Sequence, residues 1–174
     1  MDGEYLSRLQ PFHSGSYAIS DEDLSATANG FTLRATIWPT LPEKGEQAIL
    51  SCGGIILFID DNGTISGRAG ELHVAAPKPL KTRTWYRVWL TYDADGGTLT
   101  TGYEPLKRGH GAQSTIKASN LVLNGRPVIG ALEEGGIRAH FNGKIEAPAI
   151  KDGAGLVLAE WDFARDFSSI RIHD

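Results

Sequence analysis

The sequence predicts an all-β fold, a sandwich or a barrel, on three observations. The chain of 174 residues holds 21 glycines and 8 prolines, which implies many turns. Its apolar residues alternate with polar ones at the period of two that half-buried strands show. Turn residues separate these segments by about 8–12 positions, the spacing of strands in a sandwich or barrel. The length suits one domain, and 41% hydrophobic residues are enough to form its core.

Three segments justify the predicted strands most directly. Segment 31–39 alternates apolar with polar residues and stops at Pro39, which cannot donate to a sheet ladder. Segment 55–59 is apolar at every position, which predicts a strand buried on both faces. Segment 85–92 crowds aromatic and β-branched residues on both faces and is the strongest strand. The other predicted strands are 47–51, 64–67, 98–103, 121–123, 128–130, 137–145 and 155–161. One helical turn is predicted near residues 21–24.

Charge and composition exclude several classes of partner. The net charge is −4 and the basic residues are scattered, which argues against nucleic acid and against an anionic membrane surface. No apolar run approaches the ~18 residues that cross a membrane. The first residues show no signal-peptide pattern, and Cys52 has no second cysteine to pair with. We therefore expect a cytoplasmic protein.

Four segments resemble strands of laminin-G-like domains. Residues 31–39 and 47–51 resemble the opening strands of that family, and residues 85–93 resemble its central tryptophan-containing strand. Residues 141–145 resemble a late strand in which a glycine allows close sheet packing. The resemblance extends over residues 31–150. It implies a two-sheet antiparallel β-sandwich, a jelly roll of the concanavalin A-like lectin/glucanase type.

The C-terminal part resembles one group within this fold, the large (beta) subunit of N,N-dimethylformamidase. The similar segments are 141–148, 159–163 and 171–174. The resemblance implies a laminin-G-like domain that sits inside a longer chain and leads into a catalytic domain. It also implies that the parent enzyme hydrolyses small N-substituted formamides at an iron centre with tyrosine and glutamate ligands. None of those ligands matches a residue of this sequence, and the iron-binding region would lie beyond Asp174.

These observations predict the organisation and role of the chain. We expect residues 1–160 to form the sandwich and residues 161–174 to form a connector toward a further domain, because a solvated tail would not normally expose aromatic residues. The expected role is a non-catalytic accessory domain of a larger amidohydrolase. It would position or shield the catalytic domain and aid subunit assembly, so its partners would be that neighbouring domain and other subunits. The alternative is a carbohydrate-binding laminin-G-like module.

No catalytic, cofactor-binding or metal-binding residue is predicted in this segment. The five histidines show no metal-ligand spacing. The acidic turns at 60–63 and 93–96 could hold calcium, but turn geometry alone explains their Asp, Asn and Gly residues. Glu160 and Asp162 resemble a glycosidase motif that lacks its second glutamate, which disfavours a stand-alone glycosidase. Cys52 is predicted to be a small buried hydrophobic residue rather than a reactive thiol.

Four tryptophans are the candidate binding surface, because an exposed indole ring can stack on a sugar. They are Trp38, Trp85, Trp89 and Trp161. Trp85 and Trp89 share one face of their strand, which favours a second core layer over a binding platform. Trp38, next to Pro39, is predicted to be the exposed ring.

Overall fold

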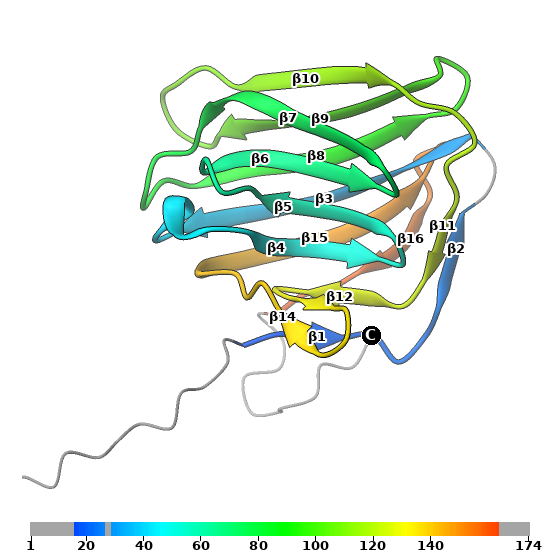
Figure 1. Cartoon of the computed structure of the whole chain (residues 1–174), viewed down its shortest axis with the longest axis horizontal. Coiled ribbons are helices and arrows are strands. Elements are labelled where there is room, and N and C mark those ends of the chain that lie inside the picture. The colour runs from blue at the N-terminus through cyan, green and yellow to red at the C-terminus, as the bar shows by residue number, and fades with distance from the viewer. Residues whose placement is uncertain (1–15, 27–28, 164–174) are drawn as a thin grey trace, which may run out of the picture.

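The computed structural model describes residues 16–26 and 29–163, and these form a β-sandwich of two six-stranded antiparallel sheets (Figure 1). The first, the β5 sheet, has the order β1 (Ala18–Ile19), β12 (Pro127–Ile129), β4 (Gln47–Cys52), β5 (Ile55–Ile59), β6 (Thr64–Ala69), β7 (Leu72–Pro79). The second, the β8 sheet, has the order β10 (Ala112–Lys117), β9 (Thr98–Pro105), β8 (Tyr86–Asp93), β3 (Gly30–Pro39), β15 (Gly143–Asp152), β16 (Val157–Glu160). The predicted two-sheet antiparallel sandwich is confirmed.

Two short ribbons complete the described part. Strand β2 (Leu24–Ala26) pairs with β11 (Leu123–Gly125), and β13 (Leu132–Glu133) pairs with β14 (Ile137–Arg138). A single 3₁₀ turn, Pro42–Lys44, begins with proline, whose fixed φ suits a first helical position. No helix in this part of the chain is long and apolar enough to cross a membrane.

The core lies between the two sheets and follows from the period-two pattern. Along β3, Phe31, Leu33, Ala35 and Ile37 are buried, while the polar residues that alternate with them are half-exposed. Strand β5 is buried at all five positions, as its uniformly apolar sequence predicts. Its inner residues join the main core, whereas Ile56 and Phe58 face the opposite side and join a second, smaller cluster.

Three local predictions are wrong. Residues 21–24 form bends leading into β2 rather than a helical turn. Segment 137–145 is not one strand, because the chain leaves the sheet at 139–142 between β14 and β15. Segment 121–123 contributes only Leu123, and the strand continues through Gly125 to pair with β2. Strands β7 and β10 were not predicted from the sequence.

Candidate functional site

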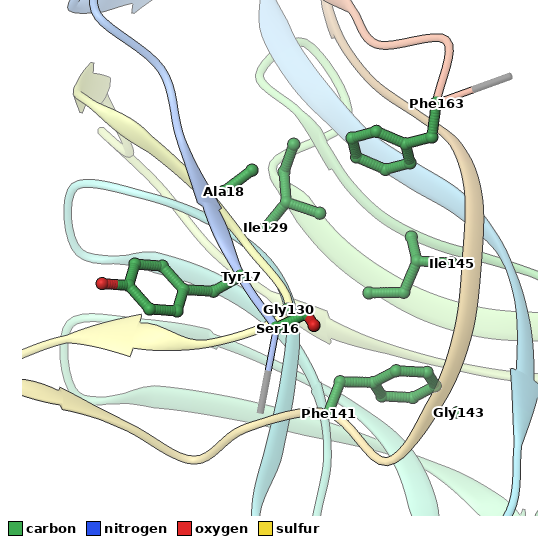
Figure 2. A pocket seen from close by; sticks show the side chains of 9 residues that line it. All are labelled: Ser16, Tyr17, Ala18, Ile129, Gly130, Phe141, Gly143, Ile145 and Phe163. Atoms are coloured by element: carbon green, nitrogen blue, oxygen red, sulfur yellow. The ribbon is translucent and has the colours of Figure 1, made fainter. Parts of the chain in front are cut away.

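An apolar cleft opens at one edge of the sandwich, where β1 and β12 of one sheet approach β15 of the other. It has a volume of about 350 Å³. In Figure 2, Ile129 of β12 and Ile145 of β15 point into it, and the Phe141 and Phe163 rings flank them. The Tyr17 ring turns away from these side chains. We call this the edge cleft.

Glycines allow the chain segments around the edge cleft to come close together. A Cβ at Gly143 would overlap the Trp38 carbonyl oxygen and lie 2.8 Å from Cε1 of the Phe141 ring. A glycine at this position therefore lets β15 pack against β3, as the family resemblance implies. Gly130 has a φ of +77°, a conformation that favours glycine, and its N–H donates to the Ile49 carbonyl at 3.0 Å.

The edge cleft lies where both limits of the described chain meet. Ser16 and Phe163, the first and last described residues, both line it. Most of the predicted connector at 161–174 lies outside the described residues. Beside the cleft, the ring of Tyr17 lies 5.9 Å from that of His140. Both His140 ring nitrogens are buried without a hydrogen-bond partner among the described residues.

Three of the four candidate tryptophans gather on the outer face of the β8 sheet. Trp85 and Trp89 are half-buried there, while Tyr86 and Val88 between them fill the core. The sequence-based preference for a second core layer at these two tryptophans is therefore wrong. Trp38 is also half-buried rather than freely exposed, because its ring lies 6.5 Å from that of Trp85.

Trp161 does not lie on this face. It is 3% exposed and belongs to the main core, so its ring is not available to a ligand. The physical reason is its position directly after β16, where alternation turns Trp161 inward between the exposed Glu160 and Asp162. Sugar binding by the other three tryptophans stays a prediction.

The acidic turn at 60–63 has a structural role. The Asp60 carboxylate accepts hydrogen bonds from the backbone N–H groups of Asn62 (2.9 Å) and Thr64 (3.0 Å). It also accepts from the hydroxyls of Thr64 (2.6 Å) and Ser66 (3.0 Å). Burial opposes ionisation of Asp60, but the bonds from Thr64, Ser66 and Asn62 outweigh it and lower its pKa. These bonds explain the geometry of the β5–β6 hairpin without a metal ion.

Cys52 is fully buried, as predicted, and its Sγ donates to the Gly125 carbonyl at 3.1 Å. Burial, with a smaller contribution from the charge of Asp23, raises the pKa of the thiol to about 12. A thiol in this environment is a poor nucleophile, because the thiolate is the reactive form.

The described residues hold no group of three or more His, Cys, Asp or Glu side chains that could bind a metal ion. The iron ligands implied by the resemblance also match no residue of this sequence. Within residues 16–26 and 29–163, the side chains do not fit an iron centre.

Comparison with known proteins agrees with the resemblance seen in the sequence. The beta subunits of N,N-dimethylformamidase from an Alcaligenes species and from Paracoccus aminophilus are each 26% identical to this chain over 94% of its length. This chain is similar to part of N,N-dimethylformamidase beta subunits. It spans only 28% of the length of either relative. The chain matches no protein-family model.

Solved structures confirm the fold. The LG1–3 region of the laminin α2 chain matches with a TM-score of 0.60 and 9% identity, over 84% of this chain and 32% of that one. A SAP-like pentraxin from Limulus polyphemus matches with a TM-score of 0.57 and 15% identity, over 82% of this chain and 71% of that one. At such low identity these likenesses concern the fold alone.

Proposed function

We propose that this chain is a non-catalytic accessory domain of a larger amidohydrolase similar to N,N-dimethylformamidase, and that it docks onto the rest of that enzyme through the edge cleft. The observation that carries the proposal is the position of the cleft. Ser16 and Phe163 both line it, so polypeptide on either side of the described residues starts at its rim.

The chemistry of the cleft suits a protein neighbour. Its walls are mainly apolar, and burying apolar surface is the main driving force for packing one domain on another. Docking here would position or shield the catalytic domain and aid subunit assembly.

The first experiment is the intact mass of the native gene product, purified from its own cells. A mass far above 18.8 kDa supports an accessory domain within a longer chain, whereas a mass near 18.8 kDa contradicts it. The isolated chain should not hydrolyse N,N-dimethylformamide. Turnover by the isolated chain would contradict a non-catalytic role.

The docking surface is tested by Ile145→Asn in the complete native protein, with Leu106→Asn as the matched control. Ile145 points into the edge cleft, while Leu106 is an exposed apolar residue outside it. We expect Ile145→Asn to lower the melting temperature and subunit assembly of the complete protein more than it destabilises the isolated chain. Leu106→Asn should affect neither. Equal losses in both settings would mean that the substitution harms only the sandwich.

A further inference from the structure

A small pocket lies on the outer face of the β8 sheet, next to the tryptophans. It has a volume of about 150 Å³ and is lined by Arg34, Thr36 and Arg87, with Ala147 at its side. We call it the arginine pocket. The strand register explains the grouping, because Thr36 pairs with Arg87 across β3 and β8. Among the described residues, the lining of this pocket and that of the edge cleft have no member in common.

A β-bulge creates the space for the arginine pocket. The pairing of β15 with β3 shifts register between Glu146 and Ala149. Within the bulge, Ala147 has a φ of +45°, a left-handed conformation that is uncommon for residues other than glycine. Bulges are frequent beside functional sites, where they redirect side chains and interrupt the ladder.

Two guanidinium groups face this space with unused hydrogen-bonding capacity. Arg34 Nη2 pairs with Glu160 at 3.4 Å, and Arg87 Nη1 pairs with Glu104 at 3.4 Å. Each of these ion pairs uses one of the guanidinium's five N–H donors. The Arg34 Nε is buried, and the described residues provide it with no acceptor. The rest of each guanidinium is open to a ligand that supplies acceptor oxygens, because the Arg34 and Arg87 side chains are 38% and 59% exposed.

An indole platform borders the same arginine. Trp89 pairs with Arg34 across the two strands, and both side chains lie on the outer face. The Trp89 ring packs against Gly102 of β9, where a Cβ would lie 2.7 Å from Cζ2 of the ring. Glycine at this position therefore lets the indole lie close to the sheet. The next outward-facing pair across β3 and β8 supplies hydroxyl groups, because Thr32 pairs with Thr91. Their Oγ1 atoms lie 3.1 Å apart.

We propose that the arginine pocket and the Trp89 ring together bind a carboxylated saccharide, such as a uronic acid residue. The arginine forks match the two oxygens of a carboxylate, and the indole offers an apolar face to the C–H side of a pyranose ring. Threonine hydroxyls alongside suit sugar hydroxyl groups. A neutral sugar would offer the two guanidinium groups no charged acceptor. This site goes beyond the accessory role and does not depend on it.

The test is titration of the full chain with a galacturonic acid trimer, followed by calorimetry and tryptophan fluorescence. The neutral comparison is a galactose trimer, and the anionic comparison is a sulfated galactose oligomer. We expect the galacturonic acid trimer to bind, and to bind more weakly as the salt concentration rises. No binding, or equal binding of the neutral or sulfated oligomer, would overturn the proposal.

Variants locate the site. Arg34→Gln and Arg87→Gln should each weaken binding by about tenfold to a hundredfold, the usual range for losing a charged hydrogen bond. Arg126→Gln is the matched control, because Arg126 is another exposed arginine paired with a glutamate, Glu133, outside this pocket. Trp89→Phe should keep the fold and remove most of the fluorescence change. Arg87 has a side chain that is 59% exposed, so its substitution tests the site even if Trp89 variants are unstable. Unchanged affinity in both arginine variants would overturn the assignment.

Discussion

Gly67 of β6 and Leu90 of β8 meet across the core from opposite sheets. A Cβ placed on Gly67 would overlap Leu90 Cδ1 and lie 3.1 Å from its Cγ. Leu90 is fully buried, so it has no solvent-exposed side into which it could move. The absence of a side chain at Gly67 is what allows this leucine to fill the space between the sheets.

Gly67→Ala should therefore destabilise the sandwich by about 1–3 kcal/mol through overpacking. Urea denaturation measures the loss. Gly54→Ala is the control, since a Cβ there would meet nothing within 4 Å, and it should leave the midpoint nearly unchanged. The double variant Gly67→Ala/Leu90→Ala should lose less stability than the sum of the losses in the two single variants. Full additivity would show that the two positions do not compete for space.

Asp60→Asn should destabilise the β5–β6 hairpin at neutral pH by about 1–3 kcal/mol, because the hydroxyls of Thr64 and Ser66 lose a charged acceptor. The folded-state pKa of Asp60 lies below the ordinary value of 3.8. Its stabilisation is thus present above pH 3.8 and is lost as the pH falls through the lower, folded-state pKa. Urea denaturation from pH 7 downward should show the gap between wild type and variant closing in acid. The neighbouring Asp61→Asn, at an exposed position, should show no such gap.

Cys52 should make the protein less stable in alkali. Its pKa is raised from 9.0 to about 12 in the folded state, first by burial and then by the charge of Asp23. An unfolded chain ionises this thiol near pH 9, whereas the folded chain keeps it protonated. The thiol's contribution is complete below pH 9 and is lost between pH 9 and about 12. Relative to Cys52→Ala, the wild type should therefore lose stability as the pH rises from 9 to about 12. A stability difference that stays constant over this range would contradict the burial argument.

Leu132→Ala should release the β13–β14 ribbon from the β5 sheet. Leu132 is 1% exposed and packs with Ala48, Ile56 and Phe58 in the smaller cluster. We expect a loss of about 2 kcal/mol or more. Hydrogen exchange should accelerate at residues 132–138 and stay slow in β8. Arg126→Ala, which removes only an exposed ion pair to the same ribbon, should leave the stability nearly unchanged.

The sequence predicted best the strands with a strong apolar pattern, whether it alternates, as in β3, or is continuous, as in β5. The predicted bounds of β3, β5 and β8 agree with the structure to within one residue. Strands β7 and β10 were missed for a physical reason, since each lies at the edge of its sheet. Strand β7 contains two prolines, and β10 presents mostly small and polar side chains, so neither carries a strong apolar pattern.

The candidate sites could not be located from the apolar pattern of the sequence, because that pattern does not reveal strand register or bulges. Trp38 and Trp85 lie far apart in the sequence, and the register of β3 against β8 brings them together. Alternation did place Trp85 and Trp89 on one face, but it could not tell the core side from the solvent side of an aromatic strand. The pocket beside Arg34 needs a bulge in β15, and no local signal marked the register shift there.

Because Ser16 and Phe163 line the same cleft, the described unit is suited to being moved between proteins. A segment whose entry and exit points lie together can be inserted into a surface loop of a host with little entropy lost on closing that loop. The same proximity favours circular permutation, in which a short linker joins these two points and new ends are opened in the 80–84 loop between β7 and β8. Under the proposed docking, the sandwich would form a transferable unit attached at one edge, and most of the outer face of the β8 sheet would be free to change independently of that edge.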